Sequence, residues 1–316
     1  MVDDGYTVSQ RFGAHKDEYP EIVWPTLSVV SGQSIQFDLP YKEVPGRTLH
    51  MDVFAPPPAL QNKAAVILVH GGGWRSGNKS HFYPLANLLA QRGYVVLLPE
   101  YRLSVEAPYP AAAIDVADAV AWATDHAASY GFEPGRVAIG GGSSGGQLAA
   151  LVAYTAHTPL FRQPVSPDQS LMALIDLDGV LDFTTPLALE HENLKKDKSA
   201  AGLWLEGAFE NQRARWIEAS PVKHIDEHAP ATLIISSGQL RFTAGSDEVI
   251  ARLSDLGIRN RYVEYDEVLH TFWLFEPYVS RVAEEIHAFL MAEAGAATPD
   301  ASRGLTPTSE DSTEGE

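Results

Sequence analysis

A glycine-rich stretch at residues 137–153, VAIGGGSSGGQLAALVA, carries the strongest chemical signal in the chain. It contains the pattern GxSxG, in which a serine projects from a sharp turn between a strand and a helix. A serine hydroxyl is a weak nucleophile, so it needs such a turn to meet both a base and a substrate. The helix that begins there directs its dipole at a developing negative charge. Two registers fit the pattern, with either Ser143 or Ser144 as the nucleophile.

Two other interpretations compete for the same stretch. Gly140, Gly142 and Gly145 match the dinucleotide-binding pattern GxGxxG, which is weak evidence when it stands alone. The pattern here also comes well after the first strand–helix unit, instead of opening the fold. A tight turn between a strand and a helix can, finally, be purely structural. The choice between these interpretations depends on the rest of the sequence.

A second motif, HGGGW at residues 70–74, favours the serine nucleophile. Successive glycines after a buried strand let backbone N–H groups point into a cavity, and this motif supplies an oxyanion hole in hydrolases that carry GxSxG. We expect the N–H groups of Gly72 and Gly73 to have this role. Neither a nicotinamide-binding fold nor a simple binding module needs both loops.

The third chemical signal is a histidine, His270, which follows the last predicted strand and precedes the terminal helix. A histidine at that place can reach across the edge of a parallel sheet to a serine on another strand. We therefore predict that His270 is the general base.

The elements that position these residues form a regular alternation. Continuous apolar runs with β-branched residues, such as residues 64–70, indicate strands buried on both faces. The predicted strands are 49–54, 64–70, 94–98, 136–139, 171–177, 232–235 and 261–265, and the predicted helices are 82–93, 111–130, 147–157 and 277–294. This alternation predicts an α/β fold with a mostly parallel, doubly wound sheet.

The motifs in this order resemble the α/β-hydrolases of the hormone-sensitive-lipase type, including bacterial acetyl and feruloyl esterases. Besides the two glycine motifs, residues 101–115 are similar to the family pattern YRLxxExPxPAAxxD, and residues 270–272 are HTF. The resemblance covers about residues 49–289. It implies an α/β-hydrolase fold, no cofactor and no metal. It also selects Ser143 as the nucleophile and makes the N–H group of Ser144 an oxyanion donor.

The acid that would orient His270 is where the sequence departs from the family. The family carries this acid in a pattern like GxxD after the penultimate strand, but Arg241 occupies the position here. Some lipases carry the acid after the preceding strand in a similar context, and the order Ser…Asp…His is then kept. We therefore predict Asp178 as the acid, with Asp182 as the second candidate and a Ser–His dyad as the third possibility.

The composition disfavours other classes of protein. The 316 residues include no Cys, which excludes a thiol nucleophile and thiolate metal sites. With 23 basic and 41 acidic residues the formal charge is −18, which disfavours nucleic acid and anionic membranes as partners. No apolar run reaches the roughly 18–20 residues of a membrane-spanning helix, and the acidic start lacks the apolar core of a signal peptide. We expect a cytoplasmic location.

These observations predict an irregular N-terminal arm at residues 1–45, a hydrolase domain at residues 46–294 and a disordered acidic tail at residues 295–316. A helical cap is expected over about residues 184–225. The predicted activity is that of a serine carboxylesterase acting on short-chain, acetyl-like esters through an acyl-enzyme. The alternatives are an amide hydrolase of the formamidase type and a non-catalytic receptor on the same fold, since Arg241 replaces the usual acid. The expected partner is a small-molecule ester, and a homodimer is possible.

Overall fold

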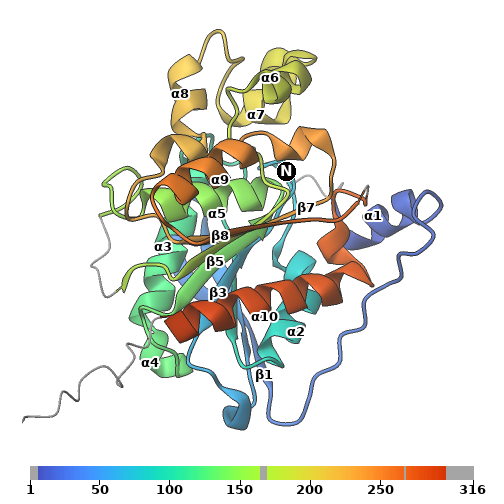
Figure 1. The fold of residues 1–316 in the computed structure, drawn as a ribbon, viewed down its shortest axis with the longest axis vertical. Helices are drawn as coiled ribbons and strands as arrows, with labels where there is room; N and C mark the ends of the chain where they lie inside the picture. Colours follow the sequence, from blue (N-terminus) through green and yellow to red (C-terminus); the bar gives the residue numbers. More distant parts are fainter. Residues whose placement is uncertain (1–5, 164–168, 267, 297–316) are drawn as a thin grey trace, which may run out of the picture.

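In the computed structural model, which describes residues 6–163, 169–266 and 268–296, an eight-stranded sheet runs through the molecule (Figure 1). The strand order is β1-β2-β4-β3-β5-β6-β7-β8. From β4 to β8 neighbouring strands are parallel, while β2 is antiparallel to both β1 and β4. The strands are β1 (Ser34–Val44), β2 (Arg47–Ala55), β3 (Ala65–Val69), β4 (Val95–Pro99), β5 (Val137–Gly142), β6 (Ala173–Leu177), β7 (Ala231–Ser236) and β8 (Asn260–Glu264).

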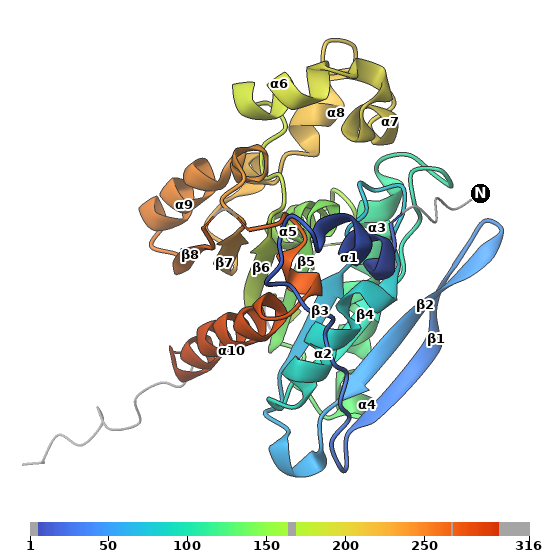
Figure 2. The same ribbon diagram turned by 90° about the vertical axis from the view of Figure 1, so that its right-hand side faces the viewer.

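Helices cover both faces of this sheet (Figures 1 and 2). On one face, α2 (Tyr83–Ala90) and α10 (Tyr278–Ala296) share a buried apolar cluster with the sheet. On the other face, α3 (Ala111–Asp125), α5 (Ser144–Thr155) and α9 (Ser246–Asp255) form the second cluster. Because both faces are covered, the central strands are mostly apolar, and AVILV of β3 is apolar along its whole length.

Three short helices are inserted between β6 and β7 and lie beyond one end of the sheet (Figure 2). They are α6 (Pro186–Asn193), α7 (Ala200–Trp204) and α8 (Arg213–Glu218). Trp204 of α7 is fully buried and stacks on Trp74, with ring centroids 4.8 Å apart. This aromatic contact attaches the inserted helices to the loop that follows β3.

Other short helices complete the described chain. These are α1 (Val8–His15), α4 (Ala127–Tyr130) and the 3₁₀ helices η1 (Pro58–Leu60), η2 (Lys79–Phe82), η4 (Lys196–Lys198), η5 (Pro221–His224), η6 (Leu240–Thr243) and η7 (Phe272–Leu274). Among the helices that the structure describes, none is both long and apolar enough to cross a membrane.

The predicted α/β-hydrolase fold class is confirmed, but two local expectations are wrong. Residues 1–45 are not irregular throughout, because they contain α1 and the eleven-residue strand β1. Strand β1 lies at the edge of the sheet and is mostly exposed, so its sequence lacks the apolar run that marks a buried strand. The helix predicted from residue 147 begins at Ser144. Of the predicted tail, residues 295 and 296 end α10, and residues 297–316 lie outside the described residues.

Candidate active site

Ser143 occupies the turn between β5 and α5 with a backbone conformation that few residues adopt. Its φ is 55° and its ψ is −125°, and its N–H group donates to the carbonyl oxygen of Leu177 at 2.8 Å. Such a conformation costs on the order of 1–3 kcal/mol and persists where the surrounding structure enforces it. Part of that enforcement is close packing, since a Cβ at Gly145 would collide with the carbonyl oxygen of Val69.

The imidazole of His270 lies within hydrogen-bonding distance of this serine. His270 belongs to the segment between β8 and η7, and its Nε2 is 2.8 Å from Oγ of Ser143. Its other nitrogen, Nδ1, is 2.9 Å from Oδ2 of Asp178. Three residues that are far apart in the sequence therefore form one hydrogen-bonded chain.

The position of Asp178 follows from the sheet. It comes directly after β6, it is 1% exposed, and its φ is 53°. While Oδ2 faces His270, Oδ1 accepts a hydrogen bond of 2.7 Å from the N–H group of Ser237 at the end of β7. A carboxylate held at both oxygens favours the imidazole tautomer with its proton on Nδ1, which leaves Nε2 free to accept the serine proton.

The surroundings of His270 keep its imidazole neutral at neutral pH. Burial lowers the pKa of His270 below the ordinary 6.5, the hydrogen bond and charge of Asp178 oppose that shift, and the positive charge of Arg241 adds to it. A neutral imidazole is the form that can accept a proton from Ser143.

Two other residues are of interest for the acid, namely Asp182 as the second candidate and Arg241 at the family's acid position, and both have different partners. Asp182 accepts hydrogen bonds from Nζ of Lys223 at 2.6 Å and from Oγ1 of Thr184 at 2.7 Å, and it does not contact His270. Arg241 lies in η6, where Nη2 is 3.4 Å from Oε1 of Glu192. The structure thus brings Asp178 to His270 and places Asp182 in a separate ion pair.

The proposed oxyanion donors belong to the loop after β3 and to the start of α5. Gly73 and Ser144 line the same cavity as Ser143, and within the described chain their N–H groups have no acceptor. Gly72 belongs to the same loop but is outside the cavity lining. Its carbonyl oxygen accepts hydrogen bonds from the N–H and hydroxyl groups of Ser76, which close the loop.

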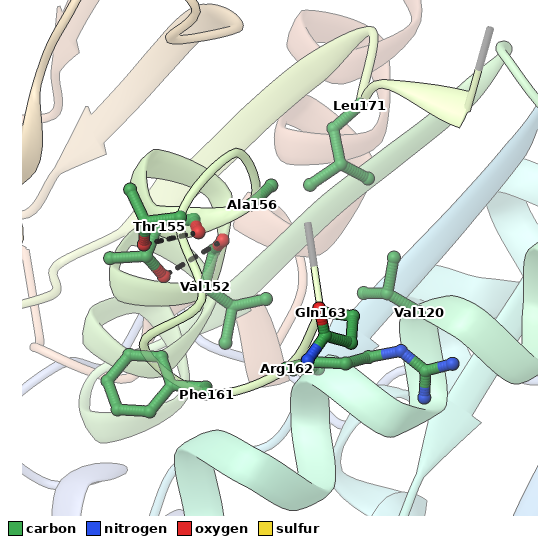
Figure 3. A pocket seen from close by; sticks show the side chains of 10 residues that line it. Val120, Val152, Thr155, Ala156, Phe161, Arg162, Gln163 and Leu171 are labelled. Atoms are coloured by element: carbon green, nitrogen blue, oxygen red, sulfur yellow. Dashed lines mark hydrogen bonds between the residues drawn. The ribbon is translucent and has the colours of Figure 1, made fainter. Parts of the chain in front are cut away.

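The cavity at Ser143 is small, with a volume of about 50 Å³. Its walls come from the loop after β3, the serine turn, the segment after β6, the inserted helices and η6. The lining residues are Gly73, Trp74, Ser143, Ser144, Asp178, Val180, Phe183, Glu192, Ala200, Arg241 and Phe242. A different cavity of about 30 Å³ lies at the far end of α5, around Val152, Thr155 and Phe161, and contains none of the candidate catalytic residues (Figure 3).

Residues of the motifs HGGGW and YRLxxExPxPAAxxD form further contacts near the site. The hydroxyl of Tyr101 donates to the carbonyl oxygen of His70 at 2.9 Å, and the two rings stack. Burial lowers the pKa of His70 to about 3, so its ring is neutral and structural. Arg102 forms a charged pair with the buried Asp115 through Nε at 2.7 Å. The contact between Tyr101 and His70 holds the end of β3 and the start of the glycine loop, whereas the Arg102–Asp115 pair joins the segment after β4 to α3.

Two residues at the site have no counterpart among the sequence predictions. The ring of Phe242 stacks on that of His270, nearly parallel, with centroids 3.3 Å apart. The carboxylate of Glu192 is buried in the cavity wall. Neither residue belongs to a recognisable motif. Glu192 comes from the inserted helices and Phe242 from η6, and both reach the site through contacts between segments that are distant in the sequence.

His224 and His228 are four positions apart, a spacing that can hold a metal ion on a helix, but they do not form a ligand set. Nε2 of His224 lies 2.7 Å from the carbonyl oxygen of Glu218, whereas the ring of His228 packs against His157. In the part of the chain that the structure describes, no group of three or more His, Cys, Asp or Glu side chains could hold a metal ion.

The sequence of this chain is similar to a family model and to proteins named as esterases. The BD-FAE family model matches residues 51–240, which is more than half of the chain. The probable carboxylic ester hydrolase LipM of Mycobacterium tuberculosis is 33% identical over 212 residues, covering 63% of this chain and 46% of that protein. Esterase LipQ of the same organism is 29% identical over 268 residues, covering 80% of this chain and 61% of that protein. The chain thus spans about half of the length of these curated relatives.

Solved structures with a similar fold also include esterases. A truncated carbohydrate esterase from gut microbiota superimposes with a TM-score of 0.70 at 19% identity, covering 86% of this chain and all of that one. Esterase B of Lactobacillus rhamnosis gives a TM-score of 0.68 at 19% identity, covering 91% of this chain and 93% of that one. At such identities the likeness concerns the fold alone. The fold and the family match together establish that this chain is a member of the BD-FAE family with the α/β-hydrolase fold.

Proposed function

We propose that this protein is a serine carboxylesterase, in which Ser143 is the nucleophile, His270 the general base and Asp178 the acid that orients it. The observation that carries this proposal is the unbroken chain of hydrogen bonds from Asp178 through His270 to Ser143 at 2.9 and 2.8 Å. The family match and the esterase relatives support the same activity.

In the first half of the proposed reaction, Oγ of Ser143 attacks the ester carbonyl carbon while Nε2 of His270 takes the hydroxyl proton. The carbonyl oxygen becomes an oxyanion, which the N–H groups of Gly73 and Ser144 can stabilise together with that of Gly72. His270 then returns the proton to the alkoxy oxygen as the C–O bond breaks. The alcohol leaves, and an acyl-Ser143 ester remains.

In the second half, water takes the place of the alcohol. His270 removes a proton from the water as its oxygen attacks the acyl carbon, and the oxyanion forms again at the same N–H groups. Collapse of this intermediate returns the proton to Oγ of Ser143 and releases the carboxylic acid. The buried carboxylate of Asp178 stabilises the imidazolium form of His270 in both halves.

A short acyl chain fits this site best. The cavity of about 50 Å³ is bounded by Trp74, Phe183 and Ala200, which leaves little room next to Ser143 for a long chain. We therefore propose acetyl or similarly small esters as substrates.

The test is hydrolysis of p-nitrophenyl acetate by the purified protein and two serine variants. We expect Ser143→Ala to abolish turnover, because no other hydroxyl within the cavity is hydrogen-bonded to His270. Ser144→Ala should retain part of the activity, since its backbone N–H group is kept. Full activity in Ser143→Ala would exclude the proposed mechanism.

The two alternatives from the sequence make different predictions in related assays. A receptor without catalytic activity should not react with a fluorophosphonate, whereas we expect covalent labelling of Ser143. The receptor hypothesis depended on the missing acid at Arg241, and Asp178 now lies at the histidine instead. A formamidase would use the same residues but cleave amides faster than the matched esters.

The remaining expectations concern the setting of the enzyme. The proposed partner is a small-molecule ester, and the mechanism uses no metal or cofactor. The negative formal charge of −18 supports the view that nucleic acids are not partners. A cytoplasmic location and a homodimer remain predictions.

A further inference from the structure

The carboxylate of Glu192 is buried at the active-site cavity with one oxygen unpaired. Glu192 lies near the end of α6 and is 7% exposed. Its Oε1 has only a long contact of 3.4 Å with Nη2 of Arg241, and within the described residues its Oε2 has no hydrogen-bond partner. Leaving a buried charged acceptor without a donor is costly, so such groups in folded proteins require an explanation. Glu192 lines the cavity that contains Ser143, so a bound ligand can supply the missing donor.

The side of the cavity where Glu192 lies identifies the part of the substrate that it meets. His270 must protonate the alkoxy oxygen of the leaving alcohol, so the alcohol extends past the imidazole. Phe242 stacks on that imidazole, and the neighbouring Arg241 contacts Glu192. The alcohol portion of the ester therefore points toward Arg241 and Glu192.

There is room for such an alcohol beyond the small cavity. A second, more open pocket of about 260 Å³ adjoins it and shares Arg241 with it. Its other lining residues, Leu187, Glu190, His191 and Leu194, belong to α6 and the residue that follows it. An alcohol larger than methanol or ethanol can thus pass Glu192 on its way out of the cavity.

We propose that Glu192 binds a hydroxyl group on the alcohol portion of the substrate, so that the enzyme prefers esters of alcohols that carry a second hydroxyl. A neutral donor suits this place better than an ammonium group, because the guanidinium of Arg241 already supplies a positive charge beside the carboxylate. Arg241 can in turn donate to the oxygen of the same hydroxyl. This inference rests on the proposed esterase activity and adds its substrate class.

The experiment compares two esters of nearly the same shape, 2-hydroxyethyl acetate and propyl acetate, in which a methyl group replaces the hydroxyl. We expect the wild-type protein to show a kcat/KM about 10- to 100-fold higher for the hydroxyl ester, the range of a hydrogen bond to a charged group. Glu192→Met keeps the size of the side chain but removes the acceptor. It should bring the ratio of the two kcat/KM values close to one.

Two further variants control this comparison. Glu210→Met removes an exposed carboxylate from the same inserted segment and should leave the ratio as in the wild type. Glu192→Gln keeps a carbonyl acceptor but removes the charge, so it should retain part of the preference. Retention also shows that changes at this position do not unfold the site.

The outcomes separate this inference from the proposed function. A wild-type ratio near one, or a ratio that Glu192→Met leaves unchanged, would overturn the role of Glu192 while both esters are still hydrolysed through Ser143. If the wild-type protein hydrolyses neither ester nor p-nitrophenyl acetate, the esterase proposal itself is wrong, and the inference about its alcohol site is wrong with it.

Discussion

At the scale of single residues, the environment of a carboxylate matters more than its place in a motif. Asp178 and Asp182 are four positions apart and both are buried, yet one faces His270 and the other pairs with Lys223. Although burial acts to raise it, hydrogen bonds from Lys223 and Thr184 lower the pKa of Asp182. Asp182 is thus committed to an ion pair and is not available to a histidine.

This difference predicts the effects of two matched variants. In Asp178→Asn the amide N–H₂ group can donate to Nδ1 of His270, which moves the ring proton to Nε2 and prevents it from accepting the Ser143 proton. Loss of the acid in comparable triads lowers turnover by about 10⁴-fold, and we expect a similar loss here. Asp182→Asn should change kcat for p-nitrophenyl acetate only a few-fold. Equal and small effects of both variants would point to a Ser–His dyad.

At the scale of secondary-structure elements, the site depends on how closely α5 approaches β3. A Cβ on Gly145 would overlap the carbonyl oxygens of both Val69 and His70, so only glycine permits the present distance between helix and strand. This contact joins the serine turn to the glycine loop, because β3 leads directly into HGGGW. The motifs GxSxG and HGGGW, which the sequence shows separately, are thus held next to each other by this one packing contact.

We predict that Gly145→Ala destabilises the protein and reduces its turnover together. The added methyl group must displace the end of β3, at a cost of about 1–3 kcal/mol or more for overpacking, and this shift moves the N–H group of Gly73. Gly13→Ala in α1 is the matched control, since nothing lies within 4 Å of its added Cβ. The control should stabilise the protein by up to about 1 kcal/mol. Urea unfolding and p-nitrophenyl acetate assays measure both effects, and equal stabilities would contradict this packing account.

At the scale of the whole molecule, the parallel sheet buries an acid in its centre. Asp176 lies in β6 and is 1% exposed, and among the described residues only Oδ2 of its carboxyl group accepts a hydrogen bond, from the N–H group of Gly179 at 3.2 Å. Burial raises the pKa of Asp176 to about 8, and the charge of Asp178 adds to the shift. The fold therefore holds Asp176 as a neutral carboxylic acid at neutral pH.

The buried acid predicts a pH dependence of global stability. Between its ordinary pKa of 3.8 and about 8, the folded protein keeps a proton on Asp176 that the unfolded chain has released. The free energy of unfolding should accordingly fall as the pH rises through this range, by up to about 1.4 kcal/mol per pH unit. Asp176→Asn carries no such proton and should flatten this part of the profile. Urea unfolding of both proteins at several values between about pH 5 and pH 8 tests this; parallel profiles would show that Asp176 is ionised in the fold.

The sequence by itself determined the fold class and the location of the two glycine motifs. These features are local, because a buried parallel strand needs a continuous apolar run, and a tight strand–helix turn needs glycine. Where the local signal was weak, prediction failed: β1 is an exposed edge strand, and its residues carry little of the pattern that marks buried strands.

Only the tertiary structure decided which acid meets His270 and which side chains line the cavity at Ser143. Asp178 is 92 residues from His270, and His270 is 127 residues from Ser143. The register of β6 and β7 pairs Leu177 with Ile235 and so puts Asp178 beside Ser237, and the segment that follows β8 brings His270 to Asp178. Glu192 reaches the cavity because α6 packs over the sheet end. Such contacts depend on packing between distant segments, whose partners no local pattern specifies.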